Sequence, residues 1–336
     1  MSNCLYAIAL LSICTLAIPV AYSAGQNERV KIIYDTDMAS DVDDVGALAL
    51  LNALADLGET EILGAMVSAI NRYTAPCLDA INTYYSRPDI PIGCVKGEGI
   101  QAESRYARFV AQKHPHDIEA GQDIPDAALL YRSILANQPK NSVVIVTVGF
   151  TTNLKNLLNT QPDEFSPLGG LDLVREKVKQ WVCMGGEFPQ GREYNLWNDA
   201  DASIQAIGNW PTPIVFSGFE IGKRVMTGKR MSETPEDNPA RTAYRYYNNL
   251  SNRESWDHTA VLYAVRGLRD YWDIQTGGAN VIHEDGSNEW VSTTDKGHAY
   301  LIEKMPPAEL AAIIEELMIK APGKQSVKEF PLYSRD

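Results

Sequence analysis

Hydrophobic positions along the chain after residue 29 fall into two alternating kinds of segment. Short apolar runs rich in β-branched residues predict strands, and most are followed by a segment with apolar residues at helical spacing. The predicted strands are 30–34, 61–67, 90–95, 142–148, 178–184 and 213–216. The predicted helices include 45–57, 76–85, 125–137, 153–159 and 306–319.

Alternation of strands and helices predicts an α/β protein with a mostly parallel, open, Rossmann-like central sheet flanked by helices. Ligands bind at the carboxyl ends of the strands in such sheets, so chemically important side chains are expected directly after strands. Asp285-Gly286 indicates a late hairpin before Trp290. Because no internal repeat, low-complexity segment or linker interrupts the pattern, we expect residues 24–336 to form one large domain.

The first 23 residues have the pattern of a secretory signal peptide. An apolar stretch from Leu5 to Val20 precedes Ala21-Tyr22-Ser23, a small-x-small cleavage pattern. We therefore expect residues 1–23 to be removed and the protein to be exported to the periplasm or the extracellular space, with no membrane span after cleavage. An uncleaved membrane anchor is the alternative, because no Lys or Arg precedes the apolar stretch, but that stretch is short for a span.

Composition narrows the choice of partners. The formal net charge is −13, which argues against nucleic acids and anionic membranes because both bind basic surfaces. Outside the signal peptide the chain has three cysteines, Cys77, Cys94 and Cys183, so at most one intrachain disulfide can form. No spacing of His and Cys indicates a zinc site.

The strongest chemical signal follows the first predicted strand, where five aspartates lie within ten residues: Asp35, Asp37, Asp41, Asp43 and Asp44. Their mutual repulsion is costly unless a cation offsets it, and oxygen ligands suit calcium or magnesium. Calcium tolerates bidentate carboxylates and high coordination better. Helix capping explains one or two of these residues rather than five. A haloacid dehalogenase-type phosphatase is a further alternative, but its downstream lysine cannot be placed in this sequence.

Two later segments carry polar side chains where ligands are expected. Glu193 and Asn195 follow a predicted strand and a Gly-Gly turn, and in an extended segment they would share one face and suit sugar hydroxyls. Asp199 is placed to cap the next helix. Asp257 stands at the head of an apolar helix. Taken alone, each segment is also explained as a capped helix start.

Together these segments resemble the inosine–uridine preferring nucleoside hydrolase family. The family's opening motif is a strand, Asp-Thr-Asp, a spacer, Asp-Asp and an apolar helix, which residues 35–44 match. Residues 193–195, Glu-Tyr-Asn, resemble its Glu-Phe-Asn, and residues 149–153 resemble its Gly-Pro-Leu-Thr-Asn turn. The resemblance runs in order from about residue 30 to 265 and implies an N-ribosyl hydrolase.

The resemblance also implies roles for individual residues. Asp37, Asp44 and Asp257 are expected to ligate Ca²⁺ through their carboxylates, and Val148 through its backbone carbonyl. Asp37 is expected to be the catalytic base toward a Ca²⁺-bound water. The residues expected to bind substrate are Asp43, Asn71, Glu193, Asn195 and Trp256.

The chain departs from the family pattern at three places. A longer spacer adds Asp41, for which we expect a solvated loop position rather than a metal ligand. The loop before Glu193 is shorter and lacks the family's Asn that contacts the 5′-hydroxyl. Trp256 stands where well-known members carry a His, a candidate acid for the leaving group, and His258 would point elsewhere. Trp256 is therefore expected either to stack on a base or to serve as a core or rim aromatic.

These features predict an enzyme that hydrolyses the N-glycosidic bond of ribonucleosides to ribose and free base. Two alternatives stay open: a glycosidase acting on another riboside or modified sugar, and a non-catalytic calcium-dependent protein that binds nucleosides or sugars. The expected partner is a small-molecule nucleoside or riboside. The resemblance also suggests a homo-oligomer, and the sequence leaves the base preference open.

Overall fold

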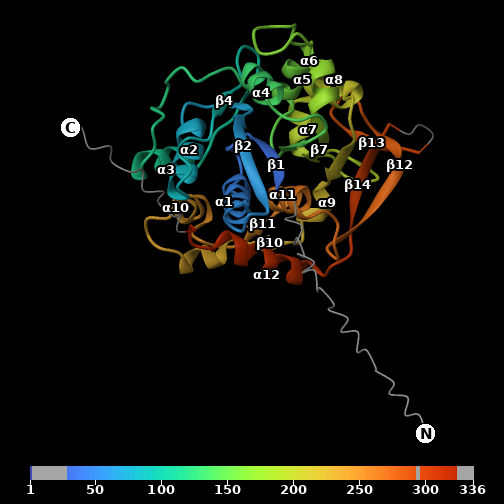
Figure 1. The fold of residues 1–336 in the computed structure, drawn as a ribbon. Helices are drawn as coiled ribbons and strands as arrows, with labels where there is room; N and C mark the ends of the chain where they lie inside the picture. Colours follow the sequence, from blue (N-terminus) through green and yellow to red (C-terminus); the bar gives the residue numbers. More distant parts are fainter. Residues whose placement is uncertain (2–28, 293–295, 324–336) are drawn as a thin grey trace.

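The six predicted strands join four others in one ten-stranded sheet (Figure 1). Across the sheet the order is β4 (Ile92–Cys94), β2 (Thr60–Val67), β1 (Val30–Thr36), β6 (Val143–Thr147), β7 (Val178–Met184), β9 (Ile214–Ser217), β14 (His298–Glu303), β12 (Trp272–Ile282), β13 (Asn288–Val291) and β8 (Gln190–Gly191). The strands from β4 to β14 pair in parallel, and the remaining three pair antiparallel. The predicted mostly parallel sheet and the late hairpin are confirmed.

This computed structural model describes residue 1, residues 29–292 and residues 296–323. Apart from residue 1, the predicted signal peptide lies outside the described residues. Within the described ranges, no helix is long and apolar enough to cross a membrane. Cys77, Cys94 and Cys183 are free thiols in the structure.

Helices cover both faces of the sheet (Figure 1). They are α1 (Asp43–Asp56), α2 (Thr74–Tyr84), α3 (Ala107–Lys113), α4 (Ala127–Ala136), α5 (Thr152–Asn159), α6 (Gly170–Lys177), α7 (Tyr194–Asn198), α8 (Ala200–Asn209), α9 (Phe219–Gly222), α10 (Pro239–Asn248), α11 (Trp256–Arg266), α12 (Pro307–Met318) and the 3₁₀ helix η1 (Lys229–Glu233). Two short strand pairs lie outside the main sheet: β3 (Ala69–Ile70) with β5 (Ile100–Gln101), and β10 (Met226–Thr227) with β11 (Arg253–Glu254).

The alternation of side chains along β1 divides the core into two layers. Ile32 and Tyr34 pack with α1, α2, α11 and α12 on one face, whereas Ile33 packs with α4, α5, α6 and α8 on the other. The central strand β6 is buried along its whole length because both of its faces are covered, which explains its continuous β-branched run. The two helical layers thus fix the sheet, and the sheet fixes the position of the strand ends.

The carboxyl ends of β1, β2 and β6 meet closely at one edge of the sheet. The backbone N–H of Val148 donates to the carbonyl of Asp35 at 2.8 Å, and that of Phe150 donates to Ser68 Oγ at 3.1 Å. A Cβ atom at Gly149 would lie 2.4 Å from the backbone nitrogen of Asp37. Glycine is therefore required at 149 for the two loops to pack together.

We predict that Gly149→Ala lowers the free energy of unfolding by about 1–3 kcal/mol, the usual effect of overpacking a close-packed interior. The matched control is Gly208→Ala in α8, where an added Cβ would meet nothing within 4 Å. That variant should be stabilised by up to about 1 kcal/mol, because alanine is the better helix former. Urea unfolding of both variants measures the difference, and equal stabilities would contradict the packing argument.

Candidate active site

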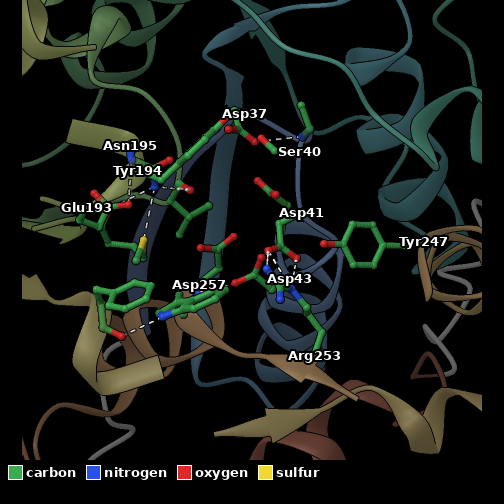
Figure 2. A pocket seen from close by; sticks show the side chains of 16 residues that line it. Asp37, Ser40, Asp41, Asp43, Glu193, Tyr194, Asn195, Tyr247, Arg253 and Asp257 are labelled. Carbon is green, nitrogen blue, oxygen red and sulfur yellow. Dashed lines mark hydrogen bonds and ion pairs between the residues drawn. The ribbon is translucent and has the colours of Figure 1, made fainter. Parts of the chain in front are cut away.

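A pocket of about 320 Å³ opens at the carboxyl ends of β1, β6 and β7 (Figure 2). Its lining is strongly acidic: the carboxylates are Asp37, Asp41, Asp43, Asp44, Glu193 and Asp257. Among the described lining residues, Arg253 is the only one with a cationic side chain. Except for Asn71, the side chains predicted to bind metal or substrate therefore come together here, with Val148 beside them.

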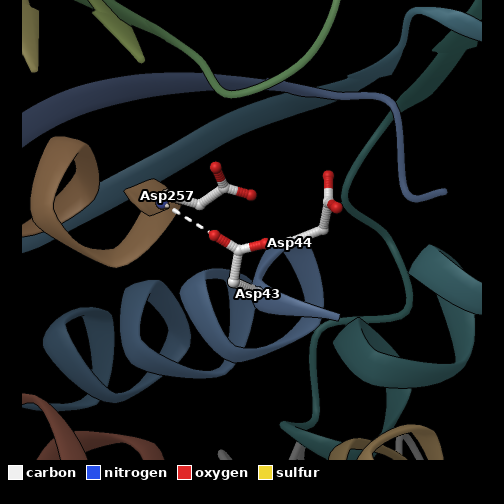
Figure 3. A group of neighbouring side chains, drawn as sticks. All are labelled: Asp43, Asp44 and Asp257. Atoms are coloured by element: carbon white, nitrogen blue, oxygen red, sulfur yellow. Dashed lines mark hydrogen bonds between the residues drawn. The ribbon is translucent and has the colours of Figure 1, made fainter. Parts of the chain in front are cut away.

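Two helix N-termini bring the central carboxylates together. Asp43 and Asp44 form the first turn of α1, and Asp257 lies in the first turn of α11 (Figure 3). Each offers one oxygen, and the three oxygens lie within 4.8 Å of one another. The backbone N–H of Asp257 donates to Asp43 Oδ2 at 3.2 Å, which ties the two helices together. The positive ends of both helices favour the negative charge gathered there.

The loop between β1 and α1 orients the carboxylates from the other side. Asp44 Oδ1 accepts a hydrogen bond from the Thr36 hydroxyl and another, 3.0 Å long, from the backbone N–H of Met38. Asp37 Oδ1 accepts from the backbone N–H of Ala39 at 2.9 Å. Met38 and Ser40 have φ values of 50° and 47°, in the left-handed region that bulky residues rarely adopt. Such backbone strain is concentrated at functional sites.

The donor set of this pocket fits a hard divalent cation. Burial raises the pKa values of the Asp43, Asp44 and Asp257 carboxyl groups well above the usual range for aspartate. The neighbouring carboxylates, Asp41 for Asp43 and Asp43 for Asp257, raise these pKa values further. Ionised carboxylates this close and this buried need a compensating charge, and oxygen ligands in such number suit calcium or magnesium.

The mutually close carboxylates differ in one residue from the metal ligands that the sequence predicts. The mutually close group among the described residues contains Asp43, which the sequence assigned to ribose, and not Asp37, which it assigned to the metal. Asp37 nevertheless lines the same pocket, and the Val148 carbonyl accepts a 3.3 Å hydrogen bond from Asn195 Nδ2. Both residues are thus placed beside the cluster rather than in its centre.

Asp35 does not belong to the pocket, although it opens the motif. Its carboxylate accepts hydrogen bonds from the Tyr131 hydroxyl at 2.8 Å and from Asn153 Nδ2 at 3.1 and 3.2 Å. Burial raises the pKa of Asp35 to about 7. Side chains alternate along a strand, so Asp35 points to the face of the sheet away from the cluster and joins β1 to α4 and α5.

Asp41 lies in the loop before α1 and outside the mutually close carboxylates, as expected, but its side chain is only 21% exposed and is ion-paired rather than freely solvated. Arg253 Nε donates to both of its oxygens, at 3.0 and 2.9 Å, from 212 positions along the chain. The guanidinium carbon also lies 5.1 Å from the centre of the Trp256 ring and 6.0 Å from that of Tyr247. The sequence identified neither Arg253 nor Tyr247. Asp41, the aspartate that the longer spacer adds to the motif, was the one feature of the sequence that indicated a cationic partner.

The segment containing Glu193 and Asn195 is a capped helix start, one of the two interpretations that the sequence left open, and not an extended segment. Glu193 caps α7, and its carboxylate accepts from the backbone N–H groups of Asn195 at 2.7 Å and Leu196 at 3.1 Å. Burial raises the pKa of Glu193 to about 7. Asp199 precedes α8 at the N-cap position, but its side chain does not cap the helix. Its carboxylate instead accepts a hydrogen bond from the Thr152 hydroxyl at 2.7 Å. Glu193 and Asn195 still reach the pocket, since helix α7 lies along its wall.

Asn71 is not brought to this pocket. Its amide nitrogen donates to the Ala102 carbonyl at 2.8 Å, and its amide oxygen accepts from the backbone N–H of Tyr73 at 3.0 Å. It lines a different cavity, beside β3 and β5. These two bonds to the backbone hold the amide in the loop, so the structure offers no support for its predicted contact with ribose.

Trp256 lines the pocket as an aromatic wall. Its Nε1 donates to the Phe219 carbonyl at 2.8 Å, and the two rings stack with centroids 5.3 Å apart. His258 is fully buried beside Gly46 and is not among the described lining residues. The expectation that His258 points away from the site is therefore confirmed.

Comparison with known proteins agrees with this geometry. The model of the family described as inosine-uridine preferring nucleoside hydrolase matches residues 32–307. The chain belongs to this family. Its members hydrolyse nucleosides, so the predicted class of N-glycosyl hydrolase is confirmed. The family is metal-dependent, in keeping with the carboxylate group at α1 and α11. No curated protein matches the chain in sequence.

Solved structures share the fold at low sequence identity. A purine-preferring ribonucleoside hydrolase from Gardnerella vaginalis is 15% identical, with a TM-score of 0.64 over 86% of this chain and 98% of its own. The inosine-uridine preferring nucleoside hydrolase from Bacillus anthracis is 15% identical, with a TM-score of 0.62 over 86% and 99%. A plant nucleoside hydrolase is 18% identical, with a TM-score of 0.62 over 86% and 99%.

The carboxylate cluster predicts an unusual dependence of stability on pH. Burial raises the pKa of Asp37 to about 7, so the folded state binds more protons than the unfolded state between about pH 4 and 7. The free energy of unfolding of the metal-free protein should therefore fall as pH rises through this range. Millimolar Ca²⁺ should raise the melting temperature at pH 8 and have little effect at pH 5, because protons and the cation compete for the same oxygens.

Differential scanning calorimetry at both pH values, with and without chelator, makes the measurement. Asp257→Asn should lose the response to Ca²⁺. Asp126→Asn, which replaces the cap of α4 with another good capping residue, should keep it. A metal-free protein that is more stable at pH 8 than at pH 5 would contradict the electrostatic account.

Proposed function

We propose that the chain hydrolyses the N-glycosidic bond of ribonucleosides, with Ca²⁺ as cofactor, to give ribose and a free base. The observation that carries the proposal is one pocket, about 320 Å³ in volume, that places the buried carboxylates of α1 and α11 opposite the polar wall of Glu193 and Asn195. A pocket of this size lies within the range usual for small ligands. An anionic floor beneath a polar wall suits a polyhydroxylated ring that gains positive charge during the reaction.

The oxygens available for the cation come from Asp43, Asp44 and Asp257, with Asp37 and the Val148 carbonyl beside them. Calcium is favoured over magnesium because it accepts six to eight oxygens in irregular geometry, including bidentate carboxylates. When bound, the ion would orient the ribose hydroxyls and lower the pKa of the attacking water.

Asp37 is the proposed general base. Its carboxylate lines the pocket, and one of its oxygens is held by the backbone N–H of Ala39. The attacking water forms a bond to C1′ and gives its proton to Asp37, while the electron pair of the C1′–N bond leaves with the base. Positioned bases of this kind contribute about 10²- to 10⁴-fold to the rate.

The sugar is bound by the two walls of the pocket. Asp43, Glu193 and Asn195 are the proposed partners of the ribose hydroxyls, since each lines the pocket and carries an oxygen that can accept a hydrogen bond. The attraction between these side chains and the ribosyl centre becomes stronger as the centre gains positive, oxocarbenium-like charge. Trp256 and Phe219 supply an apolar wall.

A riboside with an extended substituent is a second candidate substrate. Tyr194 lines the pocket with 48% of its surface exposed, and Trp197, in edge contact with it, is 44% exposed. Arg192 lies 4.4 Å over the Trp197 ring. An exposed aromatic pair with a cation suits a further ring or an anionic group.

Residues 1–23 support export, and with it scavenging of ribosides outside the cytoplasm.

Release of ribose from a panel of nucleosides, nucleoside 5′-phosphates and ADP-ribose tests the proposal. We expect turnover of at least one nucleoside by the purified protein, loss of that turnover with a calcium chelator, and recovery on adding Ca²⁺. Turnover confined to the substituted ribosides would favour the second candidate. A folded, calcium-loaded protein that binds nucleosides without releasing ribose would favour a binding role.

Asp37→Asn should lower kcat by about 10²- to 10⁴-fold, because the variant cannot accept the proton of the attacking water. The matched control, Asp201→Asn, removes an exposed carboxylate paired with Lys155 and should leave kcat unchanged. If Asp37→Asn turned over substrate at the normal rate, another residue would have to be the base.

A further inference from the structure

We propose that Arg253, positioned by Asp41, is the catalytic residue that stabilises the departing base. The proposal rests on the nucleoside hydrolase function proposed above. Cleavage of the glycosidic bond leaves an electron pair on the base, which therefore needs a proton or a positive charge beside it. The described residues that line the pocket include no His, Lys or Cys, and Arg253 is their only cation.

The Arg253 guanidinium is held firmly at the pocket wall. Its Nε and one Nη donate to Asp41, and the other Nη donates to Glu254 Oε2 at 2.6 Å. The Trp256 and Tyr247 rings contact it as cation–π partners. Its side chain is nevertheless 30% exposed, so it is accessible from the cavity.

The guanidinium keeps hydrogen-bond donors for a ligand. Of its five N–H groups, the contacts with Asp41 and Glu254 use three, which leaves two. Ring nitrogens and carbonyl oxygens of purines and pyrimidines are acceptors that a planar guanidinium can bind through two parallel hydrogen bonds. The chemistry of the site thus selects a leaving group with an acceptor edge.

Two departures from the family pattern have one explanation in this arrangement. The longer spacer in the aspartate motif adds Asp41, and Trp256 stands where a His acid is expected. In the structure Asp41 binds Arg253, and Trp256 packs against the same guanidinium. An arginine held by the added aspartate would take over the role of the missing histidine.

The reaction balances without an acid on the enzyme. The C1′–N bond breaks and its electron pair goes to the base, whose acceptor atoms bind the two free N–H groups of Arg253. Arg253 keeps its protons, because a guanidinium is not deprotonated in proteins. The water that attacks C1′ gives a proton to Asp37, which later releases it to solvent, and the released base anion takes a proton from solvent.

Paired substrates that differ in leaving group test this role. Inosine has a poor leaving group, whereas p-nitrophenyl β-D-ribofuranoside releases a stable phenolate that needs no assistance. We expect Arg253→Met to lower kcat/KM for inosine by about 10²- to 10³-fold, the usual effect of removing one such electrostatic group. For the nitrophenyl riboside, kcat/KM should fall by less than about 5-fold. Arg253→Lys, which keeps the charge and loses the planar fork, should lie in between.

Asp41→Asn tests the positioning role. It should shift the ratio of the two kcat/KM values in the same direction as Arg253→Met, and the double variant should be no worse than Arg253→Met alone, because Asp41 acts through Arg253. Arg72→Met is the matched control, since Arg72 also lies over an aromatic ring, that of Tyr73, but does not line the pocket. It should leave both values unchanged.

Three results would overturn the proposal. If Arg253→Met lost kcat/KM equally on both substrates, or no longer showed the Ca²⁺-dependent rise in melting temperature, Arg253 would have only a structural role. Unchanged turnover of inosine would remove its role altogether. If the wild-type protein prefers another nucleoside of the panel, that nucleoside replaces inosine in the comparison. A wild-type protein that releases ribose from none of the panel would instead refute the proposed function on which this inference rests.

Discussion

Mutual repulsion among buried carboxylates is the constraint that the rest of the site satisfies. Asp43, Asp44 and Asp257 hold oxygens within 4.8 Å of one another, and Asp37 lines the same pocket. Backbone N–H groups, two helix N-termini and the Thr36 hydroxyl offset part of that repulsion. A divalent cation would complete the balance, and in the proposed function its charge would also hold the ribose hydroxyls.

The fold brings these groups together because the central strands are parallel. Their carboxyl ends meet at one edge, where the loops after β1, β6 and β7 supply one wall of the pocket and α1 and α11 supply its floor (Figures 1 and 2). Gly149 lets the loops after β6 and β1 approach closely enough for the Val148 carbonyl to lie beside the cluster. Local sequence thus determines the strands, and the packing of two helical layers determines the site.

The sequence predicted the strands, the parallel sheet and most pocket residues, because periodicity and an aspartate-rich turn are local properties. It left open whether Glu193 and Asn195 lie in an extended segment or at a capped helix start, since a helix of five residues is too short to show an apolar period. It did not find Arg253, whose partner Asp41 lies 212 positions away. It also could not exclude Asn71, whose amide is held by the backbone of Ala102. Long-range pairing and backbone capping leave no periodic pattern in a single sequence.

Calorimetric titration of the metal-free protein with Ca²⁺ at pH 8 tests the central claim most directly. The account predicts one tight site per chain, with protons released on binding because burial raises the pKa of the carboxyl groups that bind the ion. Asp257→Asn should abolish that site while the chain stays folded. A folded wild-type protein that binds no divalent cation, or that binds Ca²⁺ equally well without Asp257, would contradict the account.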